Sequence, residues 1–167
     1  MVKENTKRTA HSPQSDLGRF AMSLLQKVGE ETFLQRAQEI AASQPLFSWL
    51  GARIVSVSEG ACEVELPLRR EFINDRDTLQ GTVLFALLDA ATFVASRTLV
   101  RYKGEVDFHQ EMKLNFIKAV REVKQTIRAT GRVLHRGRST AVVEGEVYDQ
   151  HGDLVVKALG TIAILRP

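Results

Sequence analysis

The sequence predicts an α+β domain in which a curved antiparallel sheet of roughly five or six strands wraps around one long central helix. The run from 81 to 100, GTVLFALLDAATFVASRTLV, is apolar almost all round, as is typical of a helix buried in a core. Segments of alternating polar and apolar residues lie on both sides of this run, and such alternation predicts half-buried strands. One helix and several strands share a single core most simply when the sheet curves around the helix.

The N-terminal residues are predicted to lie outside this domain. Residues 1–15 are polar, which predicts a disordered tail. Residues 16–44 are predicted to form a helical extension, because apolar residues recur at helical spacing after Asp16, a candidate N-cap, and again after Gly29. Such a helix pair can be a DNA-binding helix-turn-helix, but its second stretch has one arginine against three glutamates, whereas a recognition helix is expected to be basic. We therefore expect no nucleic-acid partner.

The domain itself is predicted to span residues 45–167. It begins with a short apolar helix or turn and two alternating runs, which Glu59 and Gly60 separate. A polar loop of about a dozen residues, RREFINDRDTLQ, then leads into the long helix, and loops of that length are more often functional than not. After the helix, four further strands are predicted to form a meander, at 106–117, 122–136, 138–150 and 153–167.

The composition indicates a soluble protein without a metal cluster. The 167 residues carry a formal net charge of +3 and a pI of about 9.2, and this mild basicity fits an anionic ligand. The single cysteine, Cys62, excludes an intrachain disulfide and falls in an alternating strand, where we expect a small packing residue. No apolar segment near the N-terminus resembles a secretory signal, and no run is long enough to cross a bilayer. We therefore expect a cytoplasmic protein with no membrane partner.

The order of these elements and three motifs resemble the hotdog-fold acyl-CoA thioesterases, in particular the group related to the phenylacetate-pathway thioesterases. The resemblance covers roughly residues 45–166. PLFSWLGARIVSVSEGACEVELPL is similar to the opening of that family, and RGRSTAVVEGEVYDQHGDLVVKALGTIAIL is similar to its C-terminal hairpin. The central signature of the family runs Asn, five residues, His-Gly-Gly, and then Asp eight residues after the first Gly. Here the matching residues are Asn74, Gln80, Gly81, Thr82 and Asp89.

The resemblance implies a role for each residue of this signature. Gly81, at the start of the helix, would present its N–H to the thioester oxygen. Asp89, expected to be buried, would be the nucleophile or general base, and Asn74 would hold the attacking water or the carbonyl. Each has a structural alternative: close packing for the glycine, bracing of a strand for the aspartate and a turn for the asparagine.

Two positions depart from the signature of the family. Gln80 replaces the histidine, and its side chain can donate a hydrogen bond near the carbonyl but cannot act as an acid or base. Thr82 replaces the second glycine and puts a β-branched side chain where the family lets a ligand approach the backbone. Substrate range and turnover are therefore expected to differ from those of the family.

The spacing of Gly81 and Asp89 bears on the assembly. Eight residues of helix place them about 12 Å apart along the axis and about 80° around it, too far apart for one carbonyl carbon. In the family the site is composite, with the helix start from one subunit and the aspartate from its partner. We therefore expect a homodimer, or a pair of such dimers.

The resemblance also suggests where the substrate binds. His109, on the first strand after the helix, lies where family members often place a Ser or Thr near the site. Two roles are open for it: assistance in proton transfer, or a structural role, which is the commoner one for a lone histidine on a strand. Coenzyme A carries several phosphate charges, which basic side chains bind well. The residues expected to contact that end of the substrate are Lys118, Arg136, Gly137, Arg138 and Ser139.

The function expected from the resemblance is hydrolysis of an acyl-CoA thioester to the free acid and CoA, without a metal or redox cofactor. A second hypothesis is a catalytically weak or inactive domain that binds acyl-CoA as a regulatory ligand. In that case the N-terminal helices would transmit the effect of binding. The changed residues Gln80 and Thr82 favour that hypothesis, whereas the retained Asp89 opposes it. A hotdog dehydratase is expected to have a histidine near the helix start, and Gln80 counts against it.

Overall fold

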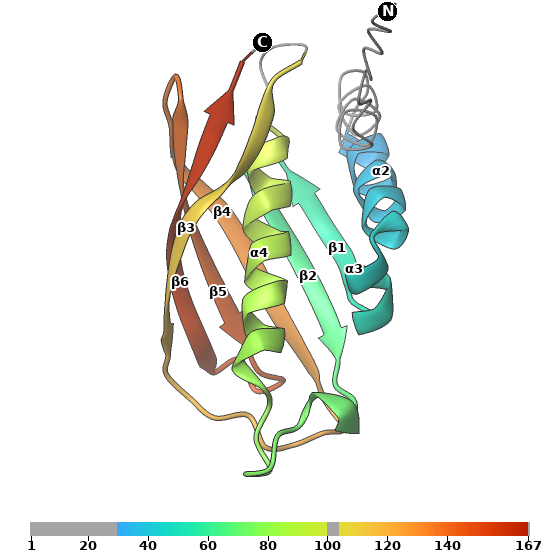
Figure 1. Ribbon diagram of the computed structural model, residues 1–167. Helices are drawn as coiled ribbons and strands as arrows, with labels where there is room; N and C mark the ends of the chain where they lie inside the picture. The colour runs from blue at the N-terminus through green and yellow to red at the C-terminus, as the bar shows by residue number, and fades with distance from the viewer. Residues whose placement is uncertain (1–29, 100–103, 167) are drawn as a thin grey trace, which may run out of the picture.

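A six-stranded antiparallel sheet curves around the long helix α4 (Figure 1), which confirms the predicted architecture. The structure is a computed structural model that describes residues 30–99 and 104–166. Its helices are α2 (Glu30–Ser43), α3 (Pro45–Leu50) and α4 (Gly81–Arg97), with a 3₁₀ turn at Arg70–Phe72. The strands are β1 (Arg53–Ser58), β2 (Ala61–Pro67), β3 (Val106–Phe116), β4 (Thr126–Arg136), β5 (Thr140–Tyr148) and β6 (Leu154–Leu165).

The strand order corrects one part of the prediction. The order across the sheet is β1-β2-β4-β5-β6-β3, so β4, β5 and β6 form a meander but β3 does not lie beside β4. The strand β4 pairs instead with β2, and β3 pairs with β6 at the far edge. The segment after β3 passes the start of α4, where the Leu79 N–H donates to Val120 O at 2.8 Å, before it enters β4 (Figure 1). The prediction assumed that consecutive strands are neighbours, which is the commoner case but fails here.

The core lies between α4 and the concave face of the sheet. On β2, Cys62, Val64 and Leu66 alternate inward and are at most 3% exposed. Burial raises the pKa of the Cys62 thiol to about 12, so this cysteine stays protonated at neutral pH and serves packing. The residues of α4 that are fully buried against the sheet are Leu87, Leu88, Ala91, Thr92, Ala95 and Ser96.

The middle of α4 lies unusually close to the sheet, in a notch formed by two glycines. Gly131 on β4 and Gly145 on β5 face each other across the strand pair. A Cβ added to Gly131 would lie 2.3 Å from the Ala91 carbonyl carbon and 2.5 Å from the Thr92 nitrogen. A Cβ added to Gly145 would lie 2.7 Å from Leu88 Cδ2. The helix backbone therefore occupies the space that side chains fill elsewhere on the sheet.

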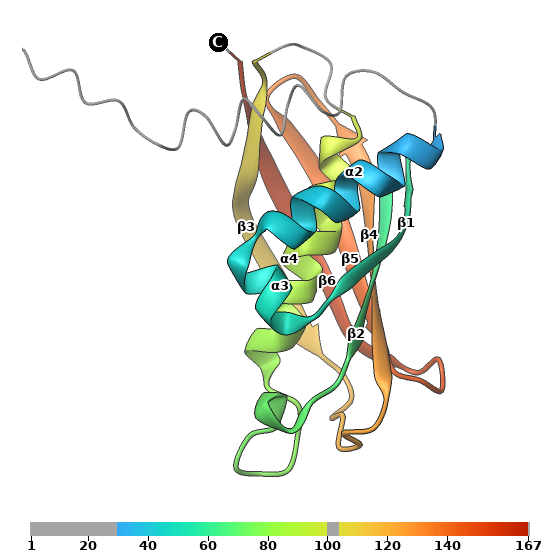
Figure 2. The same cartoon turned by 90° about the vertical axis from the view of Figure 1, so that its right-hand side faces the viewer.

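The two edges of the sheet differ in how they are covered. Helix α2 lies along β1 (Figure 2), and Gln38 Nε2 donates a hydrogen bond to Ile54 O at 2.8 Å. Residues 30–43 are helical, as the sequence predicted, whereas the predicted tail (1–15) and the first predicted helical stretch lie outside the described residues. Helix α2 therefore shields one edge of the sheet.

The opposite edge, β3, is bare. In the described part of the chain no strand pairs with its outer side. Large apolar side chains on and just beyond β3 are exposed, including Phe108 (46%), Phe116 (60%) and Ile117 (56%). Unpaired backbone groups together with exposed apolar side chains are a template for association with another chain.

Among the described helices, none is both long and apolar enough to cross a membrane.

The glycine notch predicts the effect of a single methyl group. Gly131→Ala places a Cβ against the backbone of α4, which cannot move without shifting the whole helix. We expect the free energy of unfolding to fall by about 3 kcal/mol, as measured by urea denaturation. Thr130→Ala, the neighbouring position on the outer face, is the control and is expected to change it by less than about 1 kcal/mol. Equal stability of Gly131→Ala and the wild type would contradict the close approach.

Candidate active site

Asp89 lies on the face of α4 that the sheet leaves uncovered. Its side chain is 53% exposed, so the expectation of a buried carboxylate is wrong for the single chain. Phe85, one turn earlier on the same face, is also exposed at 43%. The run looked apolar all round because small and apolar residues occupy both faces of the helix, but only one face packs against the sheet.

His109 on β3 holds the Asp89 carboxylate. The imidazole Nδ1 lies 2.9 Å from Asp89 Oδ1, and the His109 side chain is 15% exposed. The other ring nitrogen, Nε2, lies 3.0 Å from the hydroxyl of Thr92, which is fully buried. The sequence predicted that His109 lies near the site but missed Thr92. The available signal was a polar residue three positions after Asp89 in an apolar helix, a spacing at which helix residues are neighbours.

Gly81 is the first residue of α4, and the preceding loop fixes its position. Gln80 is the N-cap but forms no side-chain capping hydrogen bond, and its backbone N–H donates to Phe72 O at 2.8 Å. A Cβ added to Gly81 would lie 3.0 Å from the Phe116 ring, so the glycine also permits a close contact with the end of β3. Gln80 and Thr82 are both exposed. The first amides of α4 are thus at the surface, beside β3.

A pocket of about 430 Å³ opens beside Gly81. Its lining is largely apolar and comes from the loop before α4, the start of α4 and the segment after β3. The lining residues are Thr78, Leu79, Gly81, Leu84, Phe116, Ile117, Lys118, Ala119 and Val120. This is a suitable place for an apolar group attached to a carbonyl at the helix start.

Asn74 stabilises its own loop. Its side-chain oxygen accepts hydrogen bonds from the Arg76 N–H at 2.9 Å, the Thr78 N–H at 3.1 Å and the Thr78 hydroxyl at 3.0 Å. The structural alternative given for this residue, a turn asparagine, is therefore present. Its contact with water or a carbonyl stays a prediction, and in this structure its side-chain oxygen is already engaged.

The two halves of the predicted site do not meet within one chain. Gly81 and Asp89 lie on the same helix, about 12 Å apart along its axis. Next to each of them lies a residue of β3: Phe116 beside Gly81 and His109 beside Asp89. One chain therefore presents two separate half-sites, each between α4 and β3.

Comparison with known proteins identifies the family. The model of the thioesterase superfamily matches residues 77–156. A protein of Saccharolobus solfataricus named "Putative esterase SSO2140" is 31% identical over 121 residues, which are 72% of this chain and 84% of that protein. The chain belongs to the thioesterase superfamily.

Solved structures agree with the hotdog fold of this thioesterase-superfamily chain. The E. coli PaaI protein from the phenylacetic acid degradation operon has a TM-score of 0.73 and 23% identity, and the match covers 82% of this chain and 96% of PaaI. A hypothetical thioesterase from Streptococcus pneumoniae, solved with coenzyme A, has a TM-score of 0.62 and 22% identity over 68% of this chain and 85% of that one. These likenesses confirm the fold.

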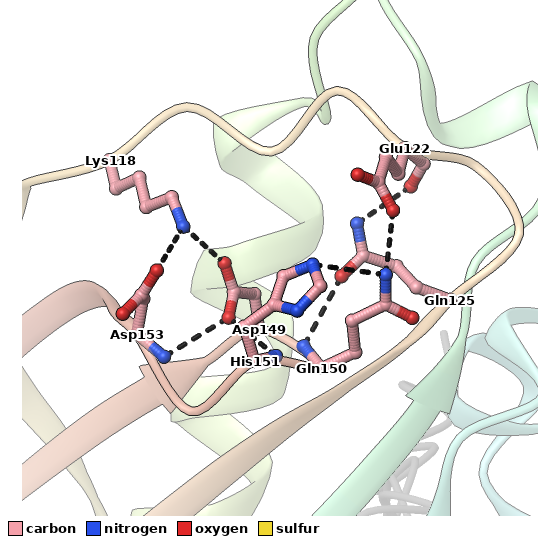
Figure 3. A network of polar contacts seen from close by, with 7 residues as sticks. All are labelled: Lys118, Glu122, Gln125, Asp149, Gln150, His151 and Asp153. Carbon is pink, nitrogen blue, oxygen red and sulfur yellow. Dashed lines mark hydrogen bonds and ion pairs between the residues drawn. The ribbon is translucent and has the colours of Figure 1, made fainter.

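Lys118, expected to bind phosphate, is held by two carboxylates in this thioesterase-superfamily domain. Its Nζ lies 2.6 Å from Asp149 and 2.5 Å from Asp153, in the turn between β5 and β6 (Figure 3). These hydrogen bonds raise the pKa of Lys118. Burial acts to raise the pKa of Asp149, but hydrogen bonds from Lys118 and from backbone N–H groups outweigh it and lower that pKa. The three side chains together carry a net negative charge, so their arrangement does not favour a phosphate contact at Lys118.

The other predicted phosphate contacts lie at the opposite end of the sheet, in the turn between β4 and β5 (Figure 1). Arg136 is buried, with 3% of its side chain exposed, and pairs with Glu105. The guanidinium faces a buried carboxylate, so this placement does not favour the predicted phosphate contact, which stays a prediction. Gly137 forms the turn, and Arg138 and Ser139 are exposed there.

Proposed function

We propose that the protein is an acyl-CoA thioesterase that hydrolyses its substrate to the free acid and CoA, at a site shared by two copies of the chain. The observation that carries this proposal is the exposed Asp89 carboxylate held by His109 on the outer face of α4. Membership of the thioesterase superfamily supports the reaction class. The structure of a Streptococcus pneumoniae relative solved with coenzyme A supports the substrate class.

The residues of the two half-sites suit the steps of thioester hydrolysis. The amides at the start of α4 would bind the carbonyl oxygen, where negative charge develops as water attacks the carbonyl carbon. His109 holds Oδ1 of Asp89, which leaves Oδ2 to accept a proton from the attacking water. Collapse of the intermediate breaks the C–S bond, and the CoA thiolate takes up the proton that Asp89 accepted, which restores the carboxylate. The proposal needs no metal or redox cofactor.

The bare edge of β3 supports a dimer. Two copies of an exposed strand can pair antiparallel about a two-fold axis, and the sheet would then continue from one copy into the other. The β1 edge is shielded by α2, so β3 is the edge on which such pairing meets no obstacle among the described residues. In this arrangement the uncovered face of α4 in one copy would lie toward that of the other.

The half-sites set the register of this pairing. Bringing Gly81 of one copy to Asp89 of the second requires Phe116 to lie opposite His109 of the second copy, because these β3 residues accompany the two half-sites. A β-bulge lies between His109 and Glu111, which makes Gln110 an extra residue in the strand. When Gln110 is left out of the pairing, Lys113 lies midway between His109 and Phe116, so the two-fold axis passes through Lys113. In this register, side chains that face the core in one copy pair with side chains that face the core in the other.

In the same antiparallel pairing, the end of one sheet that carries the β4–β5 turn would lie near the end of the other sheet that carries Gly81. The β4–β5 turn of one copy, with its exposed Arg138, would approach the Gly81 end of the other copy. Arg121 is also exposed near that end. These two guanidinium groups are our candidates for the phosphates of CoA, in place of Lys118 and Arg136.

A catalytically weak or inactive acyl-CoA binder is the second candidate function. Gln80 and Thr82, which replace a histidine and a glycine of the family signature, are the observation that favours it. A binder and an enzyme differ in one direct respect, since only the enzyme releases free CoA thiol from its ligand.

Asp89→Asn tests the reaction. The amide cannot accept the proton from water, so we expect kcat to fall by about 1,000-fold. Free thiol release is followed with short, medium and aromatic acyl-CoAs, for the wild type, Asp89→Asn and the control Glu65→Gln on β2, which should match the wild type. Equal cleavage by wild type and Asp89→Asn would exclude Asp89 as the catalytic group. If no acyl-CoA is cleaved but several raise the Tm, the protein is a binder.

Lys113→Cys tests the dimer and its register. Facing Cα atoms of an antiparallel pair lie about 4.5–5.5 Å apart, within the range that a disulfide spans. We expect a covalent dimer on a non-reducing gel after mild oxidation. Lys124→Cys, exposed in the loop before β4, is the control that should stay uncross-linked. The native Cys62 is buried and does not contribute. A Lys113→Cys protein that elutes as a monomer and forms no cross-link would contradict the pairing.

A further inference from the structure

Thr92 has a fully buried hydroxyl that touches both α4 and His109. Its Oγ1 lies 2.7 Å from Leu88 O and 3.0 Å from His109 Nε2. A hydroxyl carries one proton and can accept hydrogen bonds as well. It can therefore donate to only one of these two neighbours at a time, and the choice depends on whether His109 Nε2 carries a proton.

The contact with Asp89 fixes the other side of the imidazole. Nδ1 lies 2.9 Å from Asp89 Oδ1, and an ionised carboxylate only accepts hydrogen bonds, so Nδ1 carries a proton. When His109 is neutral, Nε2 is bare and accepts the proton of the Thr92 hydroxyl. When His109 is charged, Nε2–H donates to Thr92, whose own proton then turns to Leu88 O. The ring keeps its position in both states.

The glycine notch sets the orientation of Thr92. A Cβ added to Gly145 would lie 3.1 Å from Thr92 Cγ2, so the methyl group of Thr92 is packed over β5. This leaves the hydroxyl pointing toward β3. Around the imidazole, α4 also contributes the Phe93 ring, whose centroid is 6.2 Å away. Two residues before His109 on β3, Asp107 pairs with Arg97 and accepts a hydrogen bond from the Ser96 hydroxyl.

We propose that Thr92 is a positioning residue for the carboxylate: it holds the His109 ring with Nδ1–H on Asp89 Oδ1, and Oδ2 thereby stays directed at the attacking water. Thr92 is buried beneath His109 and does not touch the substrate. The catalytic consequence rests on the proposed thioester hydrolysis. The hydrogen-bonding pattern of His109 is independent of that proposed reaction and can be measured separately.

Two variants separate the hydroxyl of Thr92 from its methyl group. Thr92→Val keeps the shape and removes the hydroxyl, whereas Thr92→Ser keeps the hydroxyl and removes the methyl. ¹⁵N NMR of the imidazole, assigned with His109→Gln, reports which ring nitrogen carries the proton and whether the other accepts a hydrogen bond. We expect the neutral wild-type ring to be protonated at Nδ1. In Thr92→Val the neutral ring loses the hydrogen bond from the Thr92 hydroxyl to Nε2, so we expect the ¹⁵N signal of Nε2 to move downfield. We expect Thr92→Ser to keep the wild-type Nε2 signal.

Three results would overturn the proposal: a wild-type ring protonated only at Nε2, an unchanged Nε2 signal in Thr92→Val, or an Nε2 signal in Thr92→Ser that moves as far as in Thr92→Val. The first needs no variant, so a Thr92→Val protein that failed to fold would leave the test intact.

Turnover gives the second arm of the test. We expect Thr92→Val to lower kcat about tenfold with KM unchanged, because Thr92 acts through His109 on Asp89 and not on the bound substrate, and Thr92→Ser to restore kcat. A rise in KM with kcat unchanged would contradict a positioning role. If the wild type cleaves no acyl-CoA, the proposed function fails, while the ¹⁵N NMR spectra still decide whether Thr92 holds the His109 ring.

Discussion

The close approach of α4 to the sheet is the constraint on which the rest of the structure depends. Gly131 and Gly145 face each other and leave no side chain between the strands and the helix backbone at Ala91 and Thr92. The helix therefore lies deep in the concave face, level with β3. Because of that depth His109, on the edge strand, reaches Asp89, on the outer face of the helix. A helix raised by the thickness of one side chain would separate these two residues.

The same geometry leaves the outer face of α4 and the edge of β3 unprotected. Within the described chain, α2 shields the β1 edge, whereas β3 has strand pairing on one side only. Asp89 and the start of α4 both border this bare region, and each lacks the partner group that thioester hydrolysis needs. A second copy, paired along β3, would supply the missing group to each half-site. Catalysis and assembly then depend on the same surface.

The sequence predicted those features that follow from local pattern. Periodicity located α4 and the strands, and the spacing of Gly81 and Asp89 indicated two half-sites on one helix. The position of β3 was not predictable in this way, because pairing with β6 rather than β4 depends on contacts between distant segments. Burial of Arg136 follows from Glu105, a residue 31 positions away whose proximity only the fold reveals. Thr92 was missed for the same reason, since its hydroxyl acquires a role only when the notch turns it toward His109.

Subunit complementation tests the central claim, a site shared between two copies, most directly. Gly81→Pro removes the first amide of α4 at a position where helices tolerate proline, and Asp89→Asn removes the carboxylate. Each variant alone should be inactive. After joint unfolding and refolding, about half of the dimers would be mixed, each with one intact site of two, so about a quarter of the wild-type thioesterase activity should return. Mixed dimers, verified by mass, that show no activity would contradict a shared site.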